Sequence, residues 1–177
     1  MSYGVVRTDN LWGTDVRAGL VSIKYIVTTG AGTEQSPYVK TPTAIENGNV
    51  LKVGGLLDGE REIHEGVVPA AGDALSDIVL IASPEVMYDE RKRNLDEFIN
   101  EADKPCRGYH LHKGDVFSVT KDALDGAATP AVGNIVELKA GTKLNVAATL
   151  TANSTQVGTI IAIDVVGRYT YYAILVG

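Results

Sequence analysis

Short apolar runs separated by glycine, asparagine and proline set the pattern of hydrophobic and polar positions along this 177-residue chain. Runs of this length that are rich in β-branched and aromatic residues are typical of β-strands. Near the C-terminus two runs are separated only by Gly167-Arg168, and such a two-residue loop predicts a tight hairpin. The predicted strands cover residues 21–28, 50–53, 65–70, 78–82, 109–112, 115–120, 134–139, 143–150, 159–166 and 169–176.

A second turn is predicted at Asn47-Gly48-Asn49. The Asn-Gly step favours the positive φ angles of a hairpin turn, and Thr41–Glu46 and Val50–Val53 flank it. We therefore expect these two flanking segments to pair.

One segment has a helical rather than a strand period. Within residues 89–102, apolar side chains recur at Leu95, Phe98, Ile99 and Ala102, with charged residues between them. Lys104-Pro105 follows and would end a helix. The sequence predicts one short helix inserted among the strands, near 89–102.

The first 20 residues fit neither period. Glycine, aspartate and asparagine interrupt this segment, yet it contains the only tryptophan of the chain and several aliphatic residues. These apolar side chains need to be buried against their own domain or against a partner. The fold prediction is mainly β: a β-barrel or sandwich with an extended N-terminal arm. Residues 1–40 form the arm and a linker with one strand, and residues 41–177 form the β-rich globular domain.

Composition excludes several classes of protein. A formal net charge of −6 and a pI near 5.0 repel phosphate backbones and anionic lipid, so we expect neither nucleic acid nor membrane as a partner. Arg91-Lys92-Arg93 is bracketed by acidic residues and is interpreted as a solvated face. Cys106 is the only cysteine, which excludes an internal disulfide. No basic start with an apolar run is present, so we expect synthesis in a cytoplasm.

No catalytic motif stands out. His110 and His112 lie two residues apart and with Asp115 or His64 could hold zinc, but a polar strand face explains them as well. Gly30–Thr33 lacks the lysine of a phosphate-binding loop, and Cys106 with His110 is interpreted as a chance pair. The sequence therefore indicates a binding or structural component, not an enzyme, without a metal or cofactor.

Five segments together resemble small head-associated structural proteins of tailed bacteriophages, the decoration or cement proteins. These segments are MSYGVVR at the start, EGVVPAAGDALSDIVLIASPE, RGYHLHKGDVFSVTKDAL, VGNIVELKAGTKL and the terminal GRYTYYAILVG. The resemblance implies a protein that is assembled in the host cytoplasm, binds the capsid exterior of the virion and stabilises it. It also implies the major capsid protein as partner and leaves the oligomeric state open, a homo-oligomer included.

The resemblance further implies that the N-terminal arm lies along the capsid surface, where aromatic and aliphatic side chains serve as anchors. The predicted capsid-binding residues are Tyr3, Val5, Val6, Arg7, Leu11, Trp12, Val16 and Leu20.

Two alternatives stay open at this point. One is a β-barrel module that binds a ligand or a host surface through Tyr169, Tyr171 or Tyr172. The other is a small metal-dependent hydrolase that uses His110, His112 and Asp115.

Overall fold

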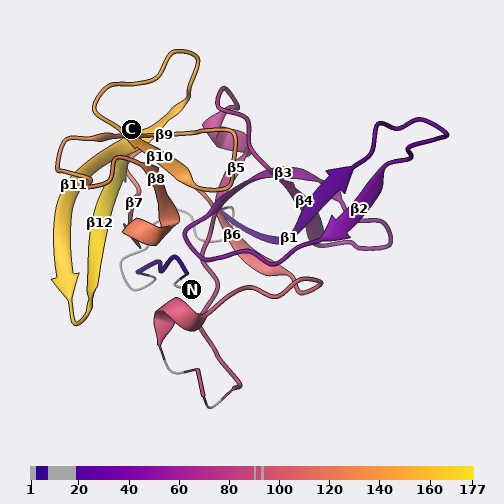
Figure 1. Cartoon of the computed structure of the whole chain (residues 1–177), viewed down its shortest axis with the longest axis horizontal. Helices are drawn as coiled ribbons and strands as arrows, with labels where there is room; N and C mark the ends of the chain where they lie inside the picture. Colours follow the sequence, from indigo (N-terminus) through magenta and orange to yellow (C-terminus); the bar gives the residue numbers. More distant parts are fainter. Residues whose placement is uncertain (1–2, 8–18, 90, 93) are drawn as a thin grey trace.

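The computed structural model describes residues 3–7, 19–89, 91–92 and 94–177, and it confirms the predicted mainly β fold class. Two sheets lie side by side in Figure 1, the first on the right and the second on the left. The strands are β1 (Leu20–Thr29), β2 (Val39–Pro42), β3 (Val50–Leu56), β4 (Ile63–Val67), β5 (Ile78–Ile81), β6 (Cys106–His110), β7 (Val116–Thr120), β8 (Leu124–Gly126), β9 (Ile135–Glu137), β10 (Leu144–Ala147), β11 (Gln156–Val166) and β12 (Tyr169–Val176).

The first sheet closes into a five-stranded barrel. Its order is β2-β1-β4-β3-β5-β6, and β1 also pairs with β6, so the ladder returns to its start and only β2 lies outside the closed ring. Closure leaves the barrel strands without free edges where they pair. β1 is a barrel strand, and it also pairs with β2, which spans residues 39–42.

The second sheet is open and has the order β7-β12-β11-β9-β10-β8. Its longest pairing is the β11–β12 hairpin, in which Val166 lies opposite Tyr169 across the loop Gly167-Arg168. Gly167 has a φ of +61°, which glycine adopts without strain. The two-residue hairpin predicted from the sequence is confirmed.

Strand β5 joins the two sheets into one body. Alternate residues point to opposite faces of a strand: Val79 and Ile81 pack inside the barrel with Ile23 and Leu51, whereas Ile78 and Leu80 pack against the second sheet. All residues of β5 are buried, as the uninterrupted apolar run predicts.

The predicted helix over 89–102 is wrong. Three short 3-10 turns are described, at Leu75–Asp77, Leu95–Glu97 and Lys121–Ala123, and of the described residues within 89–102 only the second turn is helical. Phe98 is extended, with φ −79° and ψ 135°, and Asn100 exchanges backbone hydrogen bonds with Ile45. Backbone partners elsewhere in the chain therefore replace the hydrogen bonds within a helix that the apolar spacing suggested.

The turn at Asn47-Gly48 forms, but the hairpin around it does not. Gly48 has a φ of +84°, as the Asn-Gly step predicts. Its amide donates to Ile81 O at 2.8 Å, and Ile45 on one side of the turn pairs with Asn100 instead of the flanking strand. The Asn-Gly turn thus lies in a connection between elements and joins no two paired strands. Within the described residues, no helix is long and apolar enough to cross a membrane.

Candidate functional site

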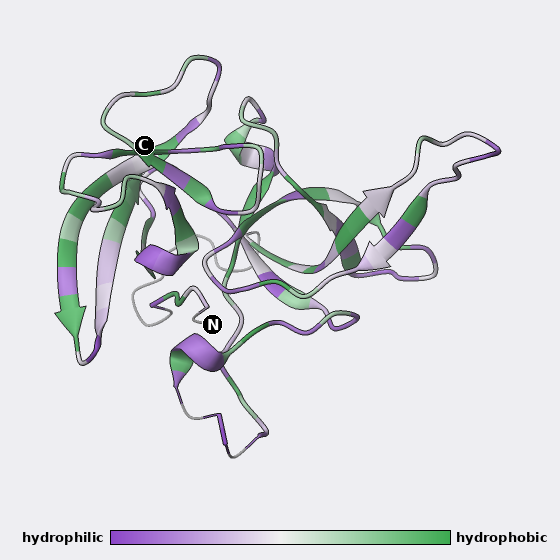
Figure 2. Ribbon diagram, in the orientation of Figure 1, coloured by the Kyte–Doolittle hydropathy of each residue, from purple (hydrophilic) through white to green (hydrophobic). Residues whose placement is uncertain are grey.

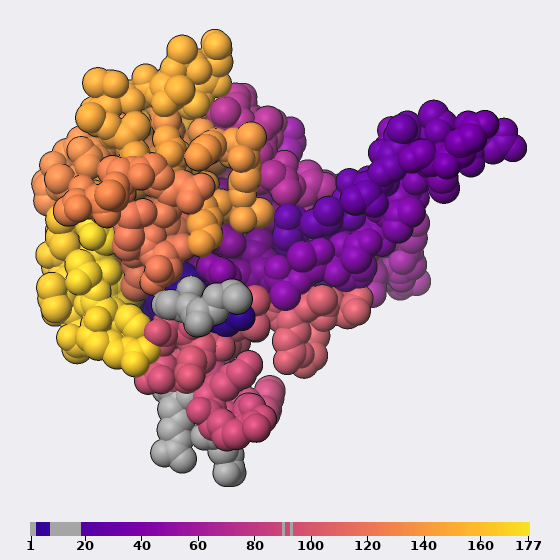
Figure 3. Space-filling view, in the orientation of Figure 1, coloured from indigo at the N-terminus to yellow at the C-terminus, as the bar shows by residue number. Residues whose placement is uncertain are grey.

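A β-hairpin projects from the barrel (Figure 3, upper right). β1 pairs with β4 and β6 up to Tyr25, and beyond that point it pairs only with β2, from Ile26–Pro42 to Thr29–Val39. Every residue from 28 to 41 is exposed. We call residues 28–41 the projecting hairpin.

Local hydrogen bonds give the tip of the projecting hairpin a defined shape. Thr33 and Ser36 exchange backbone hydrogen bonds of 3.1 Å, and the Ala31 amide donates to Ser36 O at 3.1 Å. Gly30 has a φ of +95°, and a Cβ there would lie 2.1 Å from Pro37 O, so only glycine fits. The tip is thus preorganised although none of its residues is buried.

An ion pair fixes the base of the same hairpin. Lys40 Nζ donates to Glu65 Oε2 of β4 at 2.8 Å, and this hydrogen bond raises the pKa of Lys40. The contact ties β2 to the barrel wall.

The projecting hairpin displays large side chains that its own chain leaves uncovered. Tyr38 is 67% exposed although its ring lies against Gly32, where a Cβ would come within 2.5 Å of Tyr38 Cε2. Val39 beside it is 53% exposed. An aromatic residue held by a rigid turn is the kind of residue that dominates binding energy in protein interfaces.

The start of the predicted capsid-binding arm lies in the chain's own core. Val5 and Val6 are buried, and Val6 pairs with Val119 at the edge of β7. Thr120 N donates to Val5 O at 2.9 Å, and Arg7 N donates to Ser118 O at 2.8 Å. Val5 and Val6 are therefore not available as capsid anchors in this structure, because β7 supplies the backbone and apolar partners expected from a capsid protein.

The other predicted capsid-binding residues have different surroundings. Tyr3 N donates to Asp96 O at 3.1 Å, and Arg7 forms an ion pair with Asp164 at 3.8 Å. Leu20 is exposed at the start of β1. Leu11, Trp12 and Val16 lie outside the described residues, so their predicted role stays a prediction.

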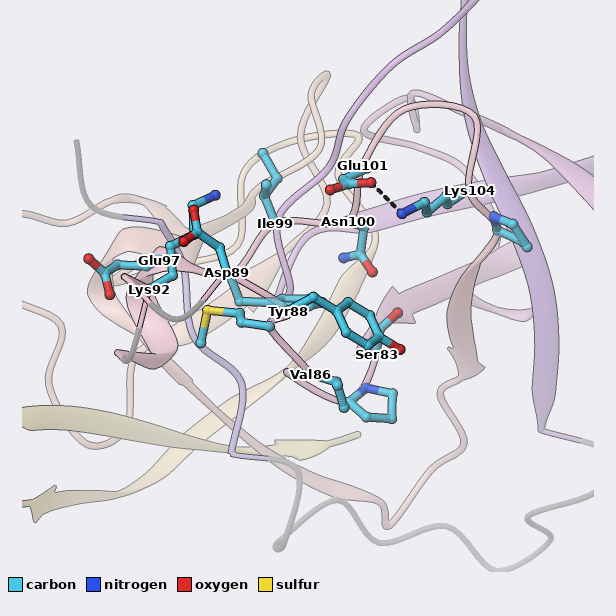
Figure 4. Close-up of a pocket in the computed structure, with 14 residues that line it drawn as sticks. Ser83, Val86, Tyr88, Asp89, Lys92, Glu97, Ile99, Asn100, Glu101 and Lys104 are labelled. Carbon is cyan, nitrogen blue, oxygen red and sulfur yellow. Dashed lines mark ion pairs between the residues drawn. The ribbon is translucent and has the colours of Figure 1, made fainter.

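A hollow of about 560 Å³ lies between the segment that follows β5 and the segment that precedes β6 (Figure 4). Val86, Tyr88 and Ile99 contribute apolar surface to it, and the Glu101–Lys104 ion pair of 2.5 Å lies at its rim. Carboxylates and lysines both line the hollow, and charges of one sign do not cluster there. The geometry does not single out a ligand for this hollow.

A buried amide cluster forms the floor beneath these segments. Asn47 Nδ2 donates to Ser83 O at 2.8 Å, Ser83 N donates to Asn47 Oδ1 at 3.0 Å, and Asn100 Nδ2 donates to Asn47 Oδ1 at 3.0 Å. Asn47 Nδ2 also lies 3.3 Å from Glu85 Oε1, and burial raises the pKa of Glu85. These polar side chains satisfy one another and hold the loops in place.

The aromatic platform proposed from the sequence is not present. Tyr171 and Tyr172 are buried, and Tyr172 belongs to the core between the sheets. The Tyr169 hydroxyl donates to Asp96 Oδ1 at 2.9 Å, and Arg168 binds the same carboxylate. The ligand-binding alternative therefore loses the exposed tyrosines on which it rests.

The three histidines do not converge on one point. His64 Nδ1 contacts Gly54 O at 3.0 Å, and His112 Nδ1 lies 3.7 Å from Asp115 Oδ2. Among the described residues, no three His, Cys, Asp or Glu side chains lie close enough to hold a metal ion. The hydrolase alternative thus has no ligand set in this part of the chain.

Cys106 lies inside the barrel, where its thiol donates to Ile23 O at 3.2 Å. Burial raises the pKa of this thiol to about 12, so the reactive thiolate is scarce near neutral pH.

The sequence prediction missed the projecting hairpin. The run TGAGTEQSP contains two glycines, a proline and, apart from Ala31, no apolar residue, so the sequence indicates a flexible linker there. A usable signal lies after the linker, where Tyr38, Val39 and Thr41 are residue types that strands favour.

Comparisons of the chain with protein family models, with curated proteins and with solved structures found no match.

Proposed function

We propose that this protein is a virion structural protein that binds the outer surface of a bacteriophage capsid and stabilises the shell. The observation that supports the proposal most is the projecting hairpin, which displays the exposed side chains of Tyr38 and Val39 next to a hydrogen-bonded tip. The resemblance of the sequence to decoration proteins supplies the class of partner. The protein contributes no chemistry in this role.

The projecting hairpin replaces residues 3–7 as the proposed capsid contact. Its tip is preorganised, so little conformational entropy is lost when it binds. The edge of β2 also offers unpaired backbone groups to a strand of the capsid protein.

Repetition over the capsid lattice compensates for the small size of such a contact. Many copies bind one assembled shell, and binding to the assembled form alone shifts the equilibrium away from free subunits. The whole shell should therefore gain thermal stability even though each attachment is modest.

The first test uses virus particles purified on a density gradient from cells that carry the gene in its native genome. We expect the chain to band with the particles in a fixed ratio to the major capsid protein and to be removed by protease added from outside. A chain that is absent from the particles, or protected inside them, would refute the proposal.

A second test assigns the contact. Particles stripped of the chain are mixed with wild-type protein, with Tyr38→Ala or with Tyr88→Ala, and bound protein is measured by co-sedimentation. We expect Tyr38→Ala to weaken binding by more than tenfold, in the range of an interface hot spot. Tyr88 is even more exposed than Tyr38 and lies at the hollow, so Tyr88→Ala is the matched control and should bind like wild type.

A further inference from the structure

Among the described residues, no strand pairs with one backbone edge of β11 over residues 161–166. β12 pairs with β11 along its whole length to Val166, but β9 pairs only with residues from Gln156 to Thr159. The last contact on that side is Ile160, which accepts from Gly133 N at 2.8 Å and donates to Asn134 O at 2.9 Å. Beyond it, no strand of the described chain pairs with this edge, which therefore presents amide and carbonyl groups to a further strand.

The same residues carry an exposed apolar face. A bulge lies between Ile160 and Ala162, after which Ile163 is opposite Tyr172 and Val165 is opposite Thr170. Ile163 and Val165 thus continue the face on which Tyr172 enters the core, but they are 41% and 73% exposed, and Ile161 at the bulge is 44% exposed. Figure 2 shows β11 as mainly hydrophobic with one hydrophilic band, whereas β12 is paler and the loop between them is hydrophilic.

The edge lacks the usual protection against strand pairing. Natural edge strands carry lysine, proline or several charges that discourage a partner. Between residues 161 and 166 the only charged residue is Asp164, and Arg7 of the same chain forms an ion pair with it at 3.8 Å. A partner strand would therefore bury no uncompensated charge at this edge.

The order of the side chains makes the edge complementary to itself. If two copies align antiparallel about Ile163, Ile163 faces its own copy, Ile161 faces Val165, and Ala162 faces Asp164. Apolar residues then meet apolar residues on one face, and no like charges lie directly opposite each other. We propose that two copies of this chain form a two-fold symmetric dimer by pairing their β11 edges about Ile163, so that the two open sheets become one continuous sheet.

This inference does not rest on capsid attachment, because the edge lies on the second sheet and the projecting hairpin extends from the barrel. Its test uses the purified full chain in solution. We expect sedimentation velocity to show a dimer at tens of micromolar and a monomer for Ile163→Lys. Leu56→Lys is the control: Leu56 is 50% exposed on β3 of the barrel, away from this edge, so the variant should stay dimeric. A cooperative thermal transition shows that each variant is folded.

The self-facing position of Ile163 allows a charge-swap test. Ile163→Lys and Ile163→Glu should each be monomeric, and an equimolar mixture should form a heterodimer because opposite charges then face each other. Ile163→Cys should also form an intermolecular disulfide under mild oxidation, since residues directly opposite in an antiparallel pair have Cα atoms within disulfide range. The native Cys106 is buried and should not compete.

Three outcomes would overturn the proposal: a wild-type chain that is monomeric at about 100 µM, a lysine–glutamate mixture that stays monomeric, or an Ile163→Cys variant that cross-links no faster than Leu56→Cys. Failure of the dimer leaves the density-gradient result unaffected, and failure of capsid binding leaves the sedimentation result unaffected.

Discussion

The barrel and the open sheet are both small β-sheets whose edge strands need partners for their backbone groups, and the two sheets obtain these partners in different ways. The barrel joins its edges through the β1–β6 pairing and encloses a small core without charged residues. The open sheet does not close into a barrel. Residues 5–7 cover the edge of β7, and on the far side of the sheet the buried carboxylate of Glu137 holds nearby segments in place through hydrogen bonds. Closure makes the barrel independent of such additions, whereas the open sheet depends on them.

The largest expected effect concerns β3 and β5, whose side chains pack both inside the barrel and against the open sheet. Leu51 packs inside the barrel and Leu80 packs against the open sheet, and both are fully buried. Leu51→Ala and Leu80→Ala should each lower the free energy of unfolding by about 3 kcal/mol through lost burial and a residual cavity. Because β3 and β5 contribute to both cores, denaturant titration should show one transition in each variant. Two separate transitions would mean that the regions fold independently.

Glu137 tests how the open sheet is ordered. Asn145 Nδ2 and Thr151 N each donate to its carboxylate at 2.7 Å, and Thr151 Oγ1 donates at 2.5 Å. Glu137→Gln replaces one carboxylate oxygen, which accepts hydrogen bonds, with an NH₂ group that donates them, so this group would face the donors of Asn145 or Thr151. It should lower the free energy of unfolding at pH 7 by about 2 kcal/mol, the range for a hydrogen-bonded charged group. A variant as stable as wild type would show that the three donors find other partners.

The pH dependence of this difference follows from the pKa of Glu137. Burial alone would raise it, but the hydrogen bonds from Thr151 and Asn145 outweigh burial and hold it below the ordinary 4.5. The ionised form is therefore favoured in the folded state, and its contribution to stability is present above pH 4.5 and lost as the pH falls through the lowered pKa. The difference in thermal stability between wild type and Glu137→Gln should narrow as the pH falls from 4.5 through the lowered pKa.

The outcome for the first residues shows what a sequence can and cannot predict. Apolar residues such as Val5 and Val6 indicate that the segment is buried, and that inference holds. Composition does not say which molecule covers them, because the edge of β7 and the edge of a capsid protein offer the same backbone groups. By contrast, the uninterrupted run of β5 has no polar face, so its burial on both sides was predictable.

The helix predicted over 89–102 failed for a related reason. Apolar spacing reports which side chains seek cover, and a helix is only one way to provide it. Asn100 and Ile45 are distant in sequence, and their pairing could not be predicted from local pattern. The projecting hairpin was missed for the opposite reason, because an exposed strand carries little apolar signal.

A smaller effect is expected from the edge of the open sheet. Val6 is buried in the core between the sheets and pairs with Val119, so Val6→Ala should lower the free energy of unfolding by about 1.5 kcal/mol, the value of two buried methyl groups. Val39→Ala, at an exposed position of the projecting hairpin, is the control and should leave stability unchanged. Equal stability of all three proteins would indicate that residues 3–7 do not support the open sheet.

The smallest effect is a gain, and it lies where the two regions are joined. Burial raises the pKa of Glu85, while the hydrogen bond from Asn47 partly opposes this shift. The folded state therefore favours the protonated form, and stability falls as the pH rises from the ordinary value of 4.5 through the raised pKa. Glu85→Gln keeps an acceptor for Asn47 and removes the charge, so it should raise the midpoint of thermal unfolding at pH 7 and have no effect near pH 4. A midpoint that falls at pH 7 would mean that the ionised carboxylate has a partner that stabilises it, and that the joint between barrel and open sheet depends on a charge.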